Sequence, residues 1–425
     1  MTLDLLRFTT AGSVDDGKST LIGRLLYDSK QVFEDQLAHV AQASERRGGE
    51  GTLDLALLTD GLRAEREQGI TLDVAYRYFA TAKRRFIIAD CPGHRQYTRN
   101  MVTGASTADV AVVLIDARRG VLEQSKRHAF ISALLGIPQM VVAINKMDLV
   151  DYSQARYEEL VEEFEAFARK LRGGKNPRRT ETSYIPMSAL NGDNVVERSQ
   201  LMPWYDGPVL LELLEQVEVA YDHPDEKPAR FPVQWVIRPA NGGGDYRGYS
   251  GQLASGALRL GDEVAVLPSG ARTRIAGIDT YDGELEEAMA PMSLTLRLED
   301  ELDVSRGELI CHPDEAPVVA RELRADICWM TDELLRPGSR YVIKQTSHSA
   351  MAMIDAIDDM VDVHTLERMA APQELGLNDI GRVRLRTSAP LVFDPYTSNR
   401  RTGSFILIDE SSNGTVGAGM IAAAT

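Results

Sequence analysis

Near the N-terminus, one short segment has the residue types and the spacing of a phosphate-binding loop. Its residues, which fit the pattern GxxxxGK[ST], are Gly12, Ser13, Val14, Asp15, Asp16, Gly17, Lys18 and Ser19, and Thr20 opens the helix expected next. The glycines let the backbone wrap around a phosphate with successive N–H groups pointing inward, and the helix N-terminus adds the positive end of its dipole. The amine of Lys18 would reach the terminal phosphates, and the hydroxyl of Ser19 would bind Mg²⁺. The segment therefore predicts a site for a nucleoside triphosphate.

A second segment predicts that the base is guanine. It consists of Asn145, Lys146, Met147 and Asp148, directly after the apolar run 140–144. The carboxylate of Asp148 can accept hydrogen bonds from both the ring N–H and the exocyclic amine of guanine, a pair of donors that adenine lacks. Lys146 can lie over the base plane, and Asn145 can tie this loop to the phosphate loop. The alternative is that Asp148 caps a helix N-terminus ahead of Leu149.

A third segment fits the remaining loop around the base. Ser188, Ala189 and Leu190 follow the strand-like run 184–187. Backbone N–H groups in this position can donate to the O6 atom of guanine.

Two further segments could sense whether the terminal phosphate is present. The first, after the strand-like run 86–89, is Asp90, Cys91, Pro92, Gly93 and His94. Asp90 could hold Mg²⁺ through water, and the N–H of Gly93 could donate to the γ-phosphate, so that the loop reorders when this phosphate leaves. His94 could then orient the attacking water as a catalytic residue; the alternative is a histidine in a surface turn. The other six histidines show no ligand spacing and are interpreted as structural or solvated.

The second of these segments is 66–71, which ends in Gly-Ile-Thr. Thr71 precedes a strand expected at 72–79 and could reach both Mg²⁺ and the γ-phosphate when its loop is ordered. The predicted metal ligands are therefore Ser19, Thr71 and Asp90, and the predicted catalytic residues are Lys18, Thr71 and His94.

These segments require elements that bring them to one edge of a sheet. Short β-branched runs at 86–89, 110–115 and 140–144 alternate with helical patterns over residues 1–222. Near-continuous apolar strands separated by helices indicate a parallel sheet covered on both faces, and ligands bind at the carboxyl ends of its strands. We expect an α/β domain over 1–222 with a mostly helical insertion at about 31–68.

Beyond a polar, proline-bracketed linker at 223–228, the pattern changes to period two. Phe231, Val233, Trp235 and Ile237 alternate with other residues, and turn signals follow at short intervals. Many short strands with regular turns predict a small antiparallel β-barrel over 228–315 and a second one over 318–425. In the second barrel, strands are expected at 324–330, 340–346, 382–388 and 402–409.

Composition narrows the classes of function. The chain has 425 residues, of which 47 are basic and 63 acidic, and its net charge is −16. Such a chain is repelled by phosphate backbones, which disfavours nucleic acid as the main partner. No stretch reaches the ~18 apolar residues of a membrane span, and the N-terminus lacks a signal-peptide pattern. The three scattered cysteines form neither a disulfide framework nor a zinc site, which favours a reducing cytoplasm.

Taken in order, the segments GSVDDGKST, REQGIT, DCPGH, NKMD and SAL, followed by two barrels, resemble the translation-factor class of GTPases. The insertion at 31–68 is similar to that of eukaryotic and archaeal elongation factors. Stretches such as LIGRLLYDSK (21–30), RQYTRNMVTGAS (95–106), VVAINKMDLVDYS (141–153) and TVGAGMI (415–421) resemble, more narrowly, the GTPase subunits of bacterial sulfate adenylyltransferases. This narrower resemblance covers nearly the whole chain.

The resemblance implies a hetero-oligomer, a heterodimer at its simplest, in which a separate small catalytic subunit binds ATP and sulfate. That subunit would transfer AMP to sulfate, and this chain would bind GTP with Mg²⁺ and hydrolyse it to drive the uphill transfer. It also implies that Lys18 holds phosphates, that Asp90 acts on the metal through water, and that His94 positions the hydrolytic water. Some relatives continue into an adenylylsulfate kinase, whose own phosphate-binding loop would have to lie beyond residue 425.

Two other functions share these features. An elongation factor that delivers aminoacyl-tRNA has the same expected fold and the same five nucleotide motifs, and a structural GTP-binding scaffold would show no partner-stimulated hydrolysis. Asp16 stands where translation elongation factors usually carry a histidine, and the net charge of −16 opposes tRNA binding. The sequence therefore favours the sulfate adenylyltransferase interpretation, with no nucleic acid and no membrane as partner.

Overall fold

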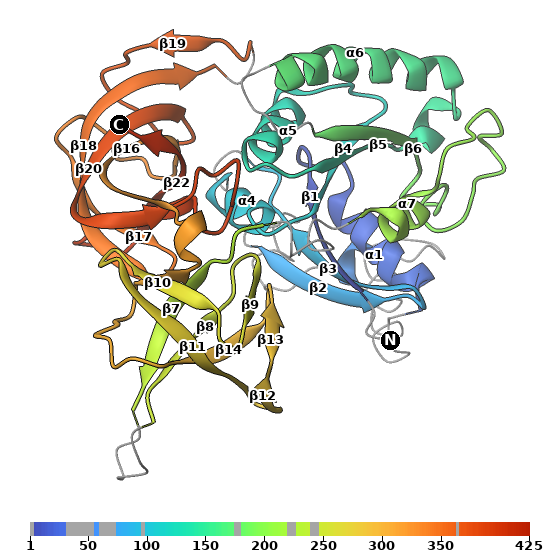
Figure 1. The fold of residues 1–425 in the computed structure, drawn as a ribbon. Coiled ribbons are helices and arrows are strands. Elements are labelled where there is room, and N and C mark those ends of the chain that lie inside the picture. Colours follow the sequence, from blue (N-terminus) through green and yellow to red (C-terminus); the bar gives the residue numbers. More distant parts are fainter. Residues whose placement is uncertain are drawn as a thin grey trace. The chain divides into compact units, whose positions relative to one another are not determined.

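The structure is a computed structural model that describes residues 4–30, 55–58, 74–94, 98–173, 180–218, 227–238, 246–362 and 365–425. The chain forms two compact units, Met1–Val219 with Val363–Leu366 and Ala220–Asp362 with Glu367–Thr425 (Figure 1). The insertion predicted at 31–68 and the predicted ligand Thr71 lie outside the described residues, apart from a short 3-10 helix, η1 (Leu55–Leu58). The division into three domains at 1–222, 228–315 and 318–425 stays a prediction.

The first unit is built on a six-stranded sheet in the order β2-β3-β1-β4-β5-β6. The strands are β1 (Asp4–Ala11), β2 (Ala75–Ala80), β3 (Arg84–Asp90), β4 (Val110–Asp116), β5 (Gln139–Asn145) and β6 (Glu181–Pro186). Strand β4 is buried along its whole length, as expected of a strand covered on both faces. The pairs from β3 to β6 are parallel, but β2 runs antiparallel to β3. The prediction of a parallel sheet is wrong for β2, because residues 81–83 are too few for a crossover connection.

Helices follow the strands of this sheet, as Figure 1 shows. They are α1 (Lys18–Asp28), α4 (Thr98–Ala105), α5 (Glu123–Leu134), α6 (Gln154–Gly173) and α7 (Leu210–Gln216), with the 3-10 helix η3 (Met147–Val150) after β5. Residues 12–17 connect β1 to α1, and η3 begins directly beyond the end of β5, so both predicted nucleotide-binding loops leave the carboxyl edge of the sheet. Among the described helices, none combines the length and the apolar character needed to span a membrane.

The described part of the second unit contains two closed antiparallel barrels of six strands each. In the first, the order is β10-β15-β7-β8-β14-β11, and β11 pairs back with β10. Its strands are β7 (Phe231–Ile237), β8 (Gly248–Gln252), β10 (Glu263–Leu267), β11 (Ala271–Thr280), β14 (Ser293–Leu298) and β15 (Leu309–Cys311); β12 (Gly283–Leu285) extends the sheet, and β9 (Ala257–Arg259) pairs with β13 (Glu287–Met289). The predicted alternation in β7 fails at a bulge between Val233 and Trp235, which leaves Trp235 65% exposed.

The second barrel has the order β17-β21-β22-β16-β20-β18 and closes through a pairing of β18 with β17. Its strands are β16 (Val318–Trp329), β17 (Arg340–Gln345), β18 (His348–Val361), β20 (Ile380–Phe393), β21 (Ser404–Ile408) and β22 (Thr415–Ala424), and β19 (Arg368–Ala370) extends the sheet. The core contains the buried rings of Trp329 and Phe393. All four predicted strands overlap observed ones, but the sequence pattern does not predict β18 or β22. Acidic residues are depleted in strands, and β18 tolerates Asp355 and Asp358 because arginines of β20 pair with them.

Candidate GTP site

The phosphate loop turns sharply between β1 and α1, and two glycines permit the turn. Gly12 has a φ of 144° and Gly17 a φ of 95°, a range that residues with a Cβ rarely adopt. A Cβ on Gly12 would lie 2.9 Å from the carbonyl oxygen of Leu114, and one on Gly17 would lie 2.5 Å from Nδ2 of Asn145. Helix α1 begins directly after Gly17, so the positive end of its dipole adjoins the loop. The two glycines therefore let the loop pack tightly against the ends of β4 and β5.

The ammonium group of Lys18 lies against the inside of this loop. Its Nζ donates to the carbonyl oxygens of Ser13 at 2.7 Å and Gly12 at 3.2 Å, and the residue is buried. Burial lowers the pKa of Lys18, against the attraction of Asp90 and Asp16. The backbone thus fixes a cation at the centre of the loop. The neighbouring predicted residues Val14, Ser19 and Thr20 are half-buried, and Asp15 is exposed.

Asp16 occupies the position where the loop departs from the elongation-factor pattern, and its side chain stabilises the loop by a hydrogen bond to the loop backbone. Its Oδ2 accepts a hydrogen bond from the backbone N–H of Ser13 at 2.6 Å. Its Oδ1 is buried and has no hydrogen-bond partner in the part of the chain that the structure describes. Burial raises the pKa of Asp16, and the charge of Lys18 opposes this effect.

Sequence reasoning missed His128, which belongs to the phosphate loop in space. The ring is fully buried, its Nδ1 accepts from the backbone N–H of Gly12 at 3.0 Å, and its Nε2 lies 3.0 Å from Nε2 of Gln124. Burial, followed by repulsion from Lys18 and Arg127, lowers the pKa of His128 to about 3, so the ring is neutral near pH 7. The only sequence signal for a role of His128 is its spacing from Gln124, one helical turn away on α5. This spacing predicts a contact between the two side chains, but it does not predict the contact of His128 with Gly12.

The segment Asp90–His94 leaves the end of β3 beside the phosphate loop. Asp90 is buried, and its Oδ1 accepts from Oγ1 of Thr10 at 3.2 Å. Gly93 packs so closely on the loop that a Cβ there would collide with Nζ of Lys18. His94 is exposed. The structure therefore brings Asp90 and Gly93 to the phosphate loop, while the role of His94 in hydrolysis stays a prediction.

Two other residues of this segment are buried away from solvent. Sγ of Cys91 lies 3.1 Å from Oγ1 of Thr9, and burial raises the pKa of the Cys91 thiol to about 12. The thiol is consequently protonated and inert near neutral pH. Pro92 is buried as well, so both residues act as packing for the turn.

One amide side chain joins the base-recognition segment to its two neighbours. Asn145 donates from Nδ2 to the carbonyl oxygen of Asp16 at 2.8 Å, and its Oδ1 accepts from the backbone N–H of Ala189 at 2.9 Å. The ammonium of Lys146 donates to the carbonyl oxygen of Asp15. The phosphate loop and the two predicted guanine loops are therefore held together by direct hydrogen bonds.

Asp148 lies inside η3, whose N-cap is Lys146. The alternative that Asp148 caps a helix is therefore wrong. Its Oδ1 is buried and has no hydrogen-bond partner among the described residues, whereas Met147 beside it packs into the core. A buried carboxylate oxygen without a donor is costly, and an N–H group of a bound base would remove that cost.

The third predicted loop is held in place from α1. Ser188 and Ala189 are buried, and Leu190 is 53% exposed. Nε of Arg24 donates to the carbonyl oxygen of Ala189 at 3.2 Å, and its Nη2 donates to that of Leu190. Because α1 also begins at the phosphate loop, one helix positions both ends of the predicted site.

The donor set fits a guanine nucleotide with Mg²⁺. Within the described residues there is no cluster of three or more His, Cys, Asp or Glu side chains that could hold a metal by themselves. Mg²⁺ usually takes one or two protein oxygens and completes its shell with phosphates and waters. Ser19 and Asp90 offer a hydroxyl and a carboxylate of this kind. The ammonium of Lys18 offers a cation for phosphates, and the unpartnered oxygen of Asp148 offers an acceptor for a base.

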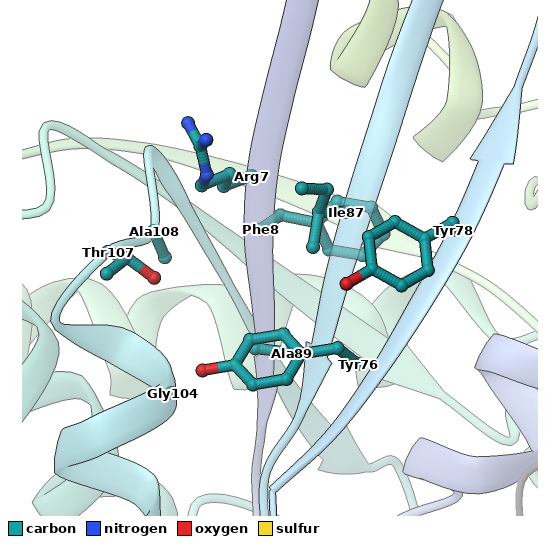
Figure 2. Close-up of a pocket in the computed structure, with 9 residues that line it drawn as sticks. All are labelled: Arg7, Phe8, Tyr76, Tyr78, Ile87, Ala89, Gly104, Thr107 and Ala108. Atoms are coloured by element: carbon teal, nitrogen blue, oxygen red, sulfur yellow. The ribbon is translucent and has the colours of Figure 1, made fainter. Parts of the chain in front are cut away.

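A pocket of about 240 Å³ lies elsewhere on the first unit, as Figure 2 shows. It is lined by Arg7, Phe8, Tyr76, Tyr78, Ile87, Ala89, Gly104, Thr107 and Ala108. None of these residues belongs to the predicted GTP site, although Ala89 directly precedes Asp90. Tyr76 and Tyr78 are 43% and 69% exposed, so the pocket is open to solvent on the side of β2.

Comparison with known proteins identifies the family of this chain. Residues 3–222 match the model of the Elongation factor Tu GTP binding domain, and residues 322–422 match that of the GTP-eEF1A C-terminal domain-like family. The chain thus belongs to the GTPases of the elongation-factor type. A solved structure of sup35 complexed with GDP is similar at 24% identity and a TM-score of 0.45, over 100% of this chain and 95% of that chain.

Curated relatives narrow the assignment. The bifunctional enzyme CysN/CysC of Mycobacterium tuberculosis is 56% identical over 98% of this chain and 67% of its own length. Sulfate adenylyltransferase subunit 1 of Vibrio vulnificus is 54% identical over 98% of this chain and 86% of its own length. The chain therefore belongs to the sulfate adenylyltransferase subunit 1 family.

Proposed function

We propose that this chain is the GTPase subunit of a sulfate adenylyltransferase. It binds GTP and Mg²⁺, and its hydrolysis of GTP drives the formation of adenylylsulfate from ATP and sulfate on a separate catalytic subunit. Membership of the sulfate adenylyltransferase subunit 1 family supports the reaction. The number in that name supports a partner, because a first subunit implies a second. The free state of the described thiols at Cys91, Cys311 and Cys328 supports a cytoplasmic location.

The unpartnered Oδ1 of Asp148 is the observation that carries the choice of GTP. A guanine ring N–H would donate to this oxygen, and the exocyclic amine would donate to the other. Adenine would leave the buried oxygen without a donor, which costs about 1–3 kcal/mol. The same loop is tied to the phosphate loop through Asn145, so base and phosphates are bound by one connected framework.

The chain's own residues supply most of the proposed chemistry. Lys18 and the loop amides neutralise the phosphate oxygens as charge develops on them in phosphoryl transfer. Mg²⁺, held by Ser19, Thr71 and a water on Asp90, would neutralise further charge when bound. His94 orients the attacking water from the segment that also carries Gly93. Because this segment packs on the loop around Lys18, loss of the γ-phosphate can move it and signal to a partner.

A reconstituted assay tests the proposal. We expect the isolated chain to bind GTP tightly, to hydrolyse it slowly and to form no adenylylsulfate. Adding a catalytic subunit with ATP and sulfate should accelerate hydrolysis, and the yield of adenylylsulfate should then depend on GTP but not be sustained by a non-hydrolysable analogue. Formation of adenylylsulfate by the isolated chain, or a GTPase rate that partner, ATP and sulfate leave unchanged, would contradict the proposal. Stimulation by ribosomes with binding of aminoacyl-tRNA would favour the elongation-factor alternative instead.

A further inference from the structure

Asp116 carries no role in the site described so far, yet strand register places it beside the base-recognition loop. Strands β4 and β5 are parallel, and Asp116, the last residue of β4, pairs with Asn145, the last residue of β5. Both therefore reach the same carboxyl edge of the sheet. Lys146 and Asp148 follow directly in the chain, so the carboxylate of Asp116 is a close neighbour of the residues proposed to contact guanine.

The side chain of Asp116 is fully buried and bound on both sides by cations. Oδ2 lies 3.0 Å from Nζ of Lys146 and 2.7 Å from Nη2 of Arg118. Oδ1 accepts from Nε and the backbone N–H of Arg118 at 3.1 Å and 2.9 Å. Burial alone would raise the pKa of Asp116, but the hydrogen bonds from Arg118 and Lys146 outweigh it and hold that pKa below its ordinary value. The carboxylate is therefore charged near neutral pH.

The ion pair with Asp116 restrains Lys146, a residue with an unfavourable backbone conformation. Lys146 has a left-handed backbone, with φ 64° and ψ 37°, and it is not glycine. It is the N-cap of η3, which carries Asp148, and its ammonium lies between Asp116 and the carbonyl oxygen of Asp15 in the phosphate loop. A strained residue at a functional loop persists only when its surroundings over-determine it. Asp116 provides that restraint from the sheet, and Asp15 provides it from the phosphate loop.

We propose that Asp116 is a positioning residue for guanine nucleotides, which acts by anchoring the Lys146 side chain and with it the loop that carries Asp148. The inference rests on the proposed GTP site. It predicts an effect on the base-binding half of the nucleotide, so GTP and GDP should be affected equally. It predicts no effect on the chemical step, because Asp116 lies beside the base loop and contacts no residue assigned to the attacking water.

The test measures the affinities of GTP and GDP in Asp116→Asn, with Asp109→Asn as the matched control. Asp109 is also buried and directly precedes the same strand at its opposite end, where its Oδ2 accepts from the backbone N–H of Arg7 at 2.9 Å. We expect Asp116→Asn to weaken GTP and GDP alike by about tenfold, the scale of one charge-assisted hydrogen bond, with kcat at saturating GTP unchanged. Asp109→Asn should change neither affinity.

Two further variants keep the inference open to refutation. If Asp116→Asn does not fold because Arg118 is left unpaired, the double variant Asp116→Asn with Arg118→Gln removes that charge and should show the same tenfold loss. In a double-mutant cycle, Asp116→Asn should add little to the loss caused by Lys146→Met, because both remove one contact. Full additivity, an equal loss in Asp109→Asn, or unchanged affinity in a protein that binds GTP would overturn the inference. A wild-type chain that does not bind GTP would instead refute the proposed function, and the inference with it.

Discussion

Charged side chains have different surroundings in the candidate GTP site of the first unit and on the outer face of the second barrel. In the site, Lys18 donates to two backbone carbonyl oxygens, and Oδ1 of Asp148 has no partner among the described residues. On the barrel, Arg382 meets Asp326 through two hydrogen bonds of 3.0 Å and 2.9 Å, and Nε of Arg384 lies 2.9 Å from Asp358. A buried carboxylate oxygen that lacks a hydrogen-bond donor favours a bound ligand, whereas a paired surface charge indicates only strand-to-strand contact.

The barrel pattern follows from strand geometry. Arg382, Arg384 and Arg386 alternate along β20 and so point to the same, outer face, opposite aspartates of β16 and β18. Their side chains are 29%, 47% and 52% exposed. Because solvent screens such pairs, we expect the whole row to contribute little to the free energy of unfolding. The following predictions test whether this contrast with the GTP site holds.

The largest effect is expected for His94→Ala in the first unit. Partner-stimulated GTP hydrolysis should fall by about 10²- to 10⁴-fold, the usual loss when a group that assists proton transfer or orients water is removed. GTP affinity should stay nearly the same, because the exposed ring contributes little to the bound ground state. Single-turnover rates and nucleotide titrations measure the two effects separately. A parallel loss of affinity and rate would assign His94 a structural role.

A smaller but still large effect is expected for Asp148→Asn. GTP affinity should fall by about 2–3 kcal/mol, because a charged group with two acceptor oxygens is replaced by a neutral amide with only one. Xanthosine triphosphate should bind better than GTP, since xanthine carries a carbonyl where guanine carries its amine. Competition titrations with both nucleotides measure the switch. If GTP affinity is unchanged in this variant, Asp148 does not contact the base.

The sequence predicts the parts of the site that are contiguous in the chain, but not the residues that only the fold brings to it. The phosphate loop and the segments 90–94, 145–148 and 188–190 are contiguous, so their chemistry can be recognised without a fold. His128 and Asp116 are joined to these loops only through the sheet, the first by a bond to Gly12 that spans 116 positions. The sequence does not predict strand β18 for a related reason. Its aspartates are tolerated in a strand because they pair with arginines of β20, which are distant in the chain.

His128 provides a prediction with a defined pH window. Its pKa is about 3 in the folded chain and near 6.5 when unfolded, so below pH 6.5 the unfolded chain binds a proton that the folded chain does not. The free energy of unfolding should therefore decrease as pH falls from about 6.5 toward 3, by up to about 1.4 kcal/mol per pH unit from this residue. Urea unfolding of the wild type and of His128→Gln between pH 4 and 7 isolates this slope, since carboxylates contribute equally to both. Identical slopes would mean that the ring is accessible to protons in the folded state.

The smallest effect is expected for Arg384→Gln on the outer face of the second barrel. Its guanidinium is 47% exposed, and its partner Asp358 is also 3.2 Å from Nε of Arg324, so the aspartate keeps a counter-charge when Arg384 is lost. The free energy of unfolding should fall by less than about 1 kcal/mol, and the difference should shrink further in high salt. GTP affinity should not change. Chemical denaturation at low and high ionic strength, with a nucleotide titration on the same samples, measures all three. A loss of more than about 2 kcal/mol would approach the cost of breaking a buried charge pair, and the distinction between a paired surface charge and the buried charges of the GTP site would then no longer hold.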